Sequence, residues 1–133
     1  MDRAFTLASR FTSKNVNKVH RISLKSNWKV DGRLEPGTTD WMEIAATRSF
    51  HFPTGISESQ KLCFCFEPAT HDTFFSLNGI RLTLTIIEGL ATVPITVMIE
   101  AINRVEIRWR GEALETPRVP EYFAAWLEIS DDM

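Results

Sequence analysis

The stretch of sequence that decides the fold lies between residues 48 and 109, and its centre reads Phe74-Phe75-Ser76-Leu77-Asn78-Gly79-Ile80-Arg81-Leu82. Apolar and polar side chains alternate on both sides of Asn78-Gly79, which is the period of a half-buried β-strand. Asn and Gly both tolerate the positive φ that a type I′ turn requires. The stretch therefore predicts a β-hairpin that turns at Asn78-Gly79.

The same period of two recurs along most of the chain, starting with Phe5 and Leu7. Further runs cover residues 20–24, 62–66, 80–86, 105–109 and 123–129. In the 62–66 run both faces are apolar, because Cys63 and Cys65 alternate with larger hydrophobic residues, and this predicts a central strand covered on both sides. Several short strands separated by turn signals predict an all-β fold, an antiparallel β-sandwich or barrel.

Breaks between the strands are expected at Asp31-Gly32, Pro36-Gly37 and Pro53-Thr54-Gly55. Residues 39–46 are compatible with one turn of helix capped by Thr39 or Asp40. Residues 97–102 fit a strand or a helix equally well. With 133 residues and no linker-like segment, the chain is expected to form one domain, residues 1–133.

The composition is that of a globular protein, with 44% hydrophobic and 24% charged residues and a net charge of -2. This balance argues against disorder and against general attraction to nucleic acid. Residues 1–35 carry eight basic and three acidic residues. A basic arm for an anionic partner is one interpretation, but we favour solvated positions on edge strands and loops.

No stretch approaches the roughly 20 apolar residues of a membrane helix, so no membrane partner is expected. The N-terminal residues lack the apolar segment of a signal peptide. We therefore expect a cytoplasmic protein, or one from which a leader has been removed.

The sequence offers little for catalysis or metal binding. Cys63 and Cys65 fall on one strand face, without a His at ligand spacing, and are interpreted as small buried residues. The histidines are scattered, no serine lies in a Gly-x-Ser-x-Gly context, and Asp131-Asp132 is only a weak calcium candidate. We expect no enzyme, no metal and no cofactor.

Four segments carry a family likeness. They are Arg48-Ser49-Phe50-His51-Phe52-Pro53, Leu62-Cys63-Phe64-Cys65-Phe66-Glu67, Leu77-Asn78-Gly79, and Ile95-Thr96 followed by Asn103, Val105 and Ile107. Their order resembles the N-terminal sugar-binding domain of family 2 glycoside hydrolases and, more broadly, the galactose-binding-like jelly roll. The usual Asp before Ile-Thr is Pro94 here, and no catalytic barrel follows. The resemblance implies a jelly-roll accessory or ligand-binding module rather than a catalyst.

The candidate ligand-binding residues are Trp28, Arg33, Asp40 and Trp41, because ligands of jelly rolls often sit at the loop-bearing end of the sandwich. An aromatic ring offers a platform for a sugar, and planar polar groups bond its hydroxyls. The competing interpretation is that these tryptophans close the ends of the sandwich.

Three further aromatic residues have other expected places. Trp109 continues a core face, whereas Tyr122 and Trp126 lie four apart on the last predicted strand. These two could form a platform, but we favour packing under a loop or against a partner.

The leading functional hypothesis is a non-catalytic, carbohydrate-binding module. The alternative is a protein-interaction or self-association domain, such as a homodimer formed through an exposed sheet face. A cupin-like enzyme is disfavoured, because such barrels present clustered His and Glu ligands and this sequence shows no such cluster.

Overall fold

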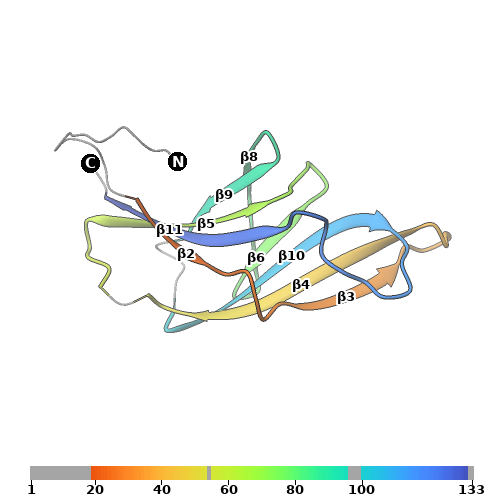
Figure 1. Ribbon diagram of the computed structural model, residues 1–133, viewed down its shortest axis with the longest axis horizontal. Helices are drawn as coiled ribbons and strands as arrows, with labels where there is room; N and C mark the ends of the chain where they lie inside the picture. The colour runs from red at the N-terminus through yellow and green to blue at the C-terminus, as the bar shows by residue number, and fades with distance from the viewer. Residues whose placement is uncertain (1–18, 54, 96–99, 132–133) are drawn as a thin grey trace.

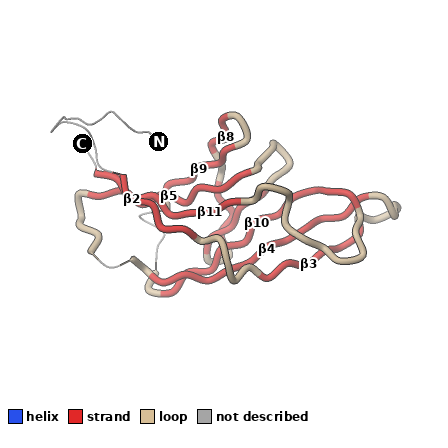
Figure 2. The backbone as a smooth tube through the Cα atoms, in the orientation of Figure 1, coloured by secondary structure: helices blue, strands red, loops and turns tan. Residues whose placement is uncertain are grey.

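The computed structural model describes residues 19–53, 55–95 and 100–131. Strands account for the regular structure of this part of the chain, and no helix occurs in it (Figure 2). The strands are β2 (Val19–Ser23), β3 (Lys29–Leu34), β4 (Trp41–His51), β5 (Gln60–Glu67), β6 (Phe74–Leu77), β7 (Ile80–Leu82), β8 (Thr85–Ile87), β9 (Leu90–Pro94), β10 (Ile102–Glu112) and β11 (Ala124–Asp131).

The strands form two antiparallel five-stranded sheets, in the orders β3-β4-β10-β6-β7 and β2-β11-β5-β9-β8 (Figure 1). The pairs β2–β11, β4–β10, β5–β9 and β6–β7 are nested in the sequence, and they alternate between the two sheets. This is the pattern of one long hairpin rolled into a jelly roll. The predicted fold class, an antiparallel β-sandwich, is confirmed.

The innermost hairpin of the roll turns where the sequence predicts. Asn78 and Gly79 have φ angles of 53° and 82°, which are the positive values of a type I′ turn. The Asn78 side chain also accepts a 2.8 Å hydrogen bond from the Arg104 amide and donates a 3.0 Å bond to Asn103 Oδ1. Asn103 is fully buried and exchanges 2.7 Å bonds with the backbone of Glu100. The two asparagines therefore lock the hairpin to β10.

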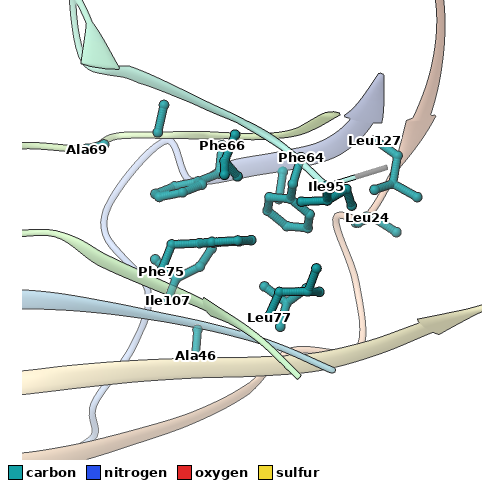
Figure 3. Packing of buried hydrophobic residues seen from close by; sticks show 14 of the residues in the cluster. Leu24, Ala46, Phe64, Phe66, Ala69, Phe75, Leu77, Ile95, Ile107 and Leu127 are labelled. Carbon is teal, nitrogen blue, oxygen red and sulfur yellow. The ribbon is translucent and has the colours of Figure 1, made fainter. Parts of the chain in front are cut away.

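The core lies between the sheets. Figure 3 shows Phe64 and Phe66 of β5 facing Phe75 and Leu77 of β6, all of them fully buried. The ring centres of Phe64 and Phe75 are 5.0 Å apart, within the range typical of aromatic pairs. Trp109 is 6% exposed, and its ring nitrogen donates a 2.8 Å hydrogen bond to the Pro68 carbonyl. The expectation that Trp109 belongs to the core is confirmed.

Two local predictions, a helical turn and a strand break, are wrong. Residues 39–46 form no helical turn, because Met42, Ile44 and Ala46 alternate as buried residues at the start of β4. Asp31-Gly32 lies inside β3 rather than at its end. A Cβ at Gly32 would approach side-chain atoms of Met42 and Pro117 to 2.6 Å, so this glycine serves close packing rather than a turn.

The apolar run from residue 80 to residue 86 is not one strand. β7 pairs with β6 in the first sheet, whereas β8 pairs with β9 in the second. The chain therefore passes from the first sheet to the second between β7 and β8. Leu82, Leu84 and Ile86 pack against the core along this passage, which explains why their alternation is unbroken. β11 likewise begins at Ala124, so Tyr122 precedes the last strand instead of sharing a face with Trp126.

The remaining expectations fall partly outside the described residues. Phe5, Leu7, residues 97–99 and Asp132 lie there. β5 is central in its sheet, as predicted, between β11 and β9. Its inward face is buried, while Cys65 is buried and Cys63 half-buried on the outward face.

Candidate functional site

The outer face of the β3-β4-β10-β6-β7 sheet carries a regular array of charges. Cross-strand pairing aligns Arg33, Glu43 and Arg110 in one row across β3, β4 and β10. The next row aligns Asp31, Ala45 and Arg108. Because strand residues alternate between faces, all these side chains point away from the core. The array arises from the register of three neighbouring strands (Figure 1).

The small side chain of Ala45 leaves a hollow of about 340 Å³ in the middle of this array, here called the face hollow. Its lining consists of Asp31, Gly32, Arg33, Glu43, Ala45, Glu106 and Arg108. The volume lies at the lower end of the range for small-molecule sites. The lining combines three carboxylates with two guanidinium groups, so it offers many hydrogen bonds around an almost balanced charge.

The two cations of the face hollow have different environments. Arg108 makes 3.0 Å ion pairs with Glu43 and with Glu106, which fix the direction of its guanidinium. In the described part of the chain, neither Arg33 nor Asp31 makes an ion pair, and both are exposed. Arg33 and Asp31 are therefore free to bond a ligand, while Arg108 forms a prearranged wall.

An aromatic ring lies on the same outer sheet face, outside the lining of the face hollow. Trp41 precedes Glu43 by two residues on the outer side of β4 and is 39% exposed. The Arg110 guanidinium lies 4.4 Å from the centre of the Trp41 ring. Glu35 holds Arg110 with bonds of 2.7 and 3.3 Å, and this contact raises the pKa of the guanidinium. Trp41 is thus fixed in place with part of its ring open to solvent.

The structure brings together two of the four predicted site residues. Arg33 and Trp41 share the outer face of the first sheet, but only Arg33 lines the face hollow. Asp40 is exposed in the preceding turn, where its carbonyl accepts a 2.9 Å bond from the Ala113 amide. It does not line the face hollow.

Trp28 lies apart from the other three. Its ring nitrogen donates a 2.6 Å bond to the Leu24 carbonyl, and its ring packs edge-on against Phe123 at 5.3 Å. Trp28 is partly buried against the core, which is the place expected of a residue that closes the end of the sandwich.

Of the seven lining residues, the sequence predicts only Arg33 as a site residue, and four of the other six lie on β4 and β10. Glu43, Ala45, Glu106 and Arg108 belong to ordinary alternating strand segments. The sequence did carry one signal in the polar positions of the later strand. These positions hold a single acidic residue, Glu106, among the basic residues Arg104, Arg108 and Arg110. The register between β4 and β10 is needed to see that Glu43 of β4 and Glu106 of β10 both lie beside the Arg108 guanidinium.

The outer face of the second sheet has a different character. Cys65 is 2% exposed and lies opposite Trp126 on β11. Burial, with a further contribution from Glu128, raises the pKa of the Cys65 thiol to about 11, and the same two causes raise the pKa of Cys63. Both thiols are therefore protonated at neutral pH and are poor nucleophiles. Trp126 is half-buried, with the Arg21 guanidinium 5.3 Å from its ring centre.

The described residues contain no group of three or more His, Cys, Asp or Glu side chains arranged to hold a metal ion. Nor does any helix in that part of the chain have the length and apolar character to cross a membrane. No family model, no curated protein and no solved structure matches the chain.

Proposed function

We propose that this protein is a non-catalytic binding module that recognises carbohydrate through the face hollow. The observation that carries the proposal is the open hollow around Ala45, where Arg33 and Asp31 make no ion pair with the described residues, on the same sheet face as the partly exposed ring of Trp41. Sugar hydroxyls need planar donors and acceptors, which guanidinium and carboxylate groups supply. The resemblance to sugar-binding jelly rolls is consistent with this function.

The charge of the lining narrows the ligand class. Arg108 is already neutralised by Glu43 and Glu106, whereas Arg33 and Asp31 make no ion pair with any residue that the structure describes. A strongly anionic sugar would meet three carboxylates in a hollow that offers one free guanidinium. The face hollow therefore suits a neutral mono- or oligosaccharide.

The test fills the hollow without removing any polar group. Ala45→Leu places a larger side chain on its floor, and we expect it to weaken binding of a neutral sugar by at least about tenfold. Thr47→Leu is the matched control, because Thr47 is the next outward residue on the same strand but does not line the face hollow. A glycan array followed by calorimetric titration measures both variants.

Two results would refute the proposal. One is silence of the unmodified protein across a broad panel of neutral and acidic glycans. The other is that every glycan bound by the unmodified protein binds Ala45→Leu equally tightly. Thermal melting of both variants provides the check on folding, and we expect both melting temperatures to stay within about 3 °C of the original.

A further inference from the structure

The turn that leads into β11 contains a residue in an unfavourable backbone conformation. The Phe123 amide donates a 3.1 Å hydrogen bond to the Pro120 carbonyl, which closes a four-residue turn. Tyr122, the third residue of this turn, has a φ of +65°. A positive φ at the third position is the pattern of a type II turn, where glycine is favoured because a Cβ crowds the backbone. A tyrosine at this position is strained.

Packing inside the molecule does not account for this tyrosine. Tyr122 is 87% exposed, and among the described residues its side chain has no hydrogen bond or ring contact. Its neighbour Phe123, by contrast, packs edge-on against Trp28 and Trp109, with 5.3 Å between ring centres in each pair. Phe123 therefore anchors the turn, and the anchored turn projects the Tyr122 ring into solvent. Strain that the rest of the fold holds in place is a recurring property of ligand sites.

Two residues of the strained turn line a hollow of about 850 Å³, here called the loop-end hollow. The segment between β10 and β11 folds back along the end of the sandwich and forms one wall (Figure 1). The apolar part of the lining includes Ile44, Trp109, Leu114 and Val119. Pro120 and Glu121, the two residues before Tyr122, also line it.

Polar groups at the loop-end hollow are available to a ligand. Arg118 and Glu121 both line it and are exposed, and neither makes an ion pair within the described residues. Tyr122 is not part of the lining, but it directly follows the lining residue Glu121, and its exposed ring is therefore available at the edge of the hollow. An aromatic face combined with a guanidinium and a carboxylate suits a pyranose ring. The C–H groups of the sugar can lie on the electron-rich face of the phenol, and the hydroxyls can bond the charged groups.

We propose that Tyr122 is the stacking platform of a second carbohydrate-binding site, formed with Arg118 and Glu121 at the loop-end hollow. The inference rests on the proposed function for the class of ligand, but it uses a different surface. The face hollow opens on the outer side of the first sheet, whereas Ile44 and Trp109 point to its inner side. The two sites can therefore be removed separately.

The experiment compares two strained turn residues. Glu88 is exposed with a φ of +50° and lies outside the loop-end hollow, so it is the matched control for Tyr122. We expect Tyr122→Gly and Glu88→Gly each to raise the melting temperature, by about 2–5 °C, because glycine relieves the strain. Only Tyr122→Gly should weaken glycan binding, by about five- to tenfold, while Tyr122→Phe keeps the ring and the affinity.

The outcomes separate this inference from the proposed function. Loss of binding in Tyr122→Gly, with Ala45→Leu unchanged, would support the loop-end site and refute the face hollow. Loss in Ala45→Leu alone, or a Tyr122→Gly variant that is no more stable than the original, would overturn the role of Tyr122. The expected result is that Ala45→Leu loses binding at the face hollow and Tyr122→Gly loses binding at the loop-end hollow. An unmodified protein that binds no glycan overturns both proposals.

Discussion

The two outer faces of the sandwich are built from the same alternation and have opposite characters. On the β3-β4-β10 side, the outward side chains are charged, exposed and arranged around a hollow. On the β2-β11-β5 side, the outward residues include Cys65, which is 2% exposed, and the half-buried Trp126. A period of two shows which side chains point away from the core. It does not show whether they surround a hollow, as on the first face (the open face), or cover one another, as on the second (the closed face).

The size of the outward side chains accounts for the difference. On the second face, Trp126 lies opposite Cys65 and carries Arg21 above its ring, so a large aromatic and its cation cover a small residue. On the first face, Ala45 lies between Asp31 and Arg108, and no aromatic side chain is among the described residues that line the hollow above it. The closed face should therefore contribute to stability, and the open face should contribute to binding.

The largest expected effect concerns the buried thiol of the closed face. In the folded protein the pKa of Cys65 is about 11, against an ordinary value of 9.0. Between these values the unfolded chain loses the thiol proton while the folded protein keeps it, so ionisation favours unfolding. The contribution is fully present below pH 9, and about 2–3 kcal/mol of the free energy of unfolding should be lost as the pH rises to 11.

Urea unfolding at several pH values, under reducing conditions, measures this loss. Cys65→Ala is the control, because it removes this thiol and keeps the other groups that titrate at alkaline pH. The stability of the variant should fall less steeply above pH 9 than that of the original protein. Parallel pH profiles for the two proteins would show that the closed face does not shield this thiol.

A smaller effect is expected from the two tryptophans that occupy opposite faces. Trp126→Ala should cost about 1–2 kcal/mol of stability, because it uncovers Cys65 and removes the contact with Arg21. It should leave glycan binding unchanged. Trp41→Ala should show the reverse, with a stability loss below about 1 kcal/mol and weaker binding at the face hollow.

Light scattering on the same variants tests the competing function. If the unmodified protein were a stable dimer and Trp126→Ala converted it to a monomer, the closed face would be an interface between copies. The comparison of a stabilising face with a binding face would then be wrong.

Much of the fold follows from local chemistry that a sequence displays. The Asn78-Gly79 turn, the buried alternation through Phe64 and the core position of Trp109 all depend on residue type and period alone. Gly32 was misread because its role depends on Pro117, which is distant in the sequence and packs against the strand. Contacts of this kind have no local signature.

The candidate site was only partly predictable for a related reason. Arg33 and Trp41 were identified as isolated polar and aromatic residues near turns, without knowledge of what lies beside them. The hollow depends on Ala45 facing Arg108 across two strands that are far apart in the sequence. The strain at Tyr122 is a backbone property, and the residue type gives no hint of it.

The smallest expected effect on stability comes from the unpaired charge of the open face. Arg33→Ala should change the free energy of unfolding by less than about 0.5 kcal/mol, because Arg33 is exposed and makes no ion pair with the described residues. The same change should weaken glycan binding several-fold, since a guanidinium that bonds the ligand is lost. Lys29→Ala is the matched control. Lys29 lies four residues before Arg33 on the same outward side of β3, but it does not line the face hollow. Equal binding by the two variants would show that the unpaired cation of the hollow has no part in recognition, and the open face would then differ from the closed one in packing alone.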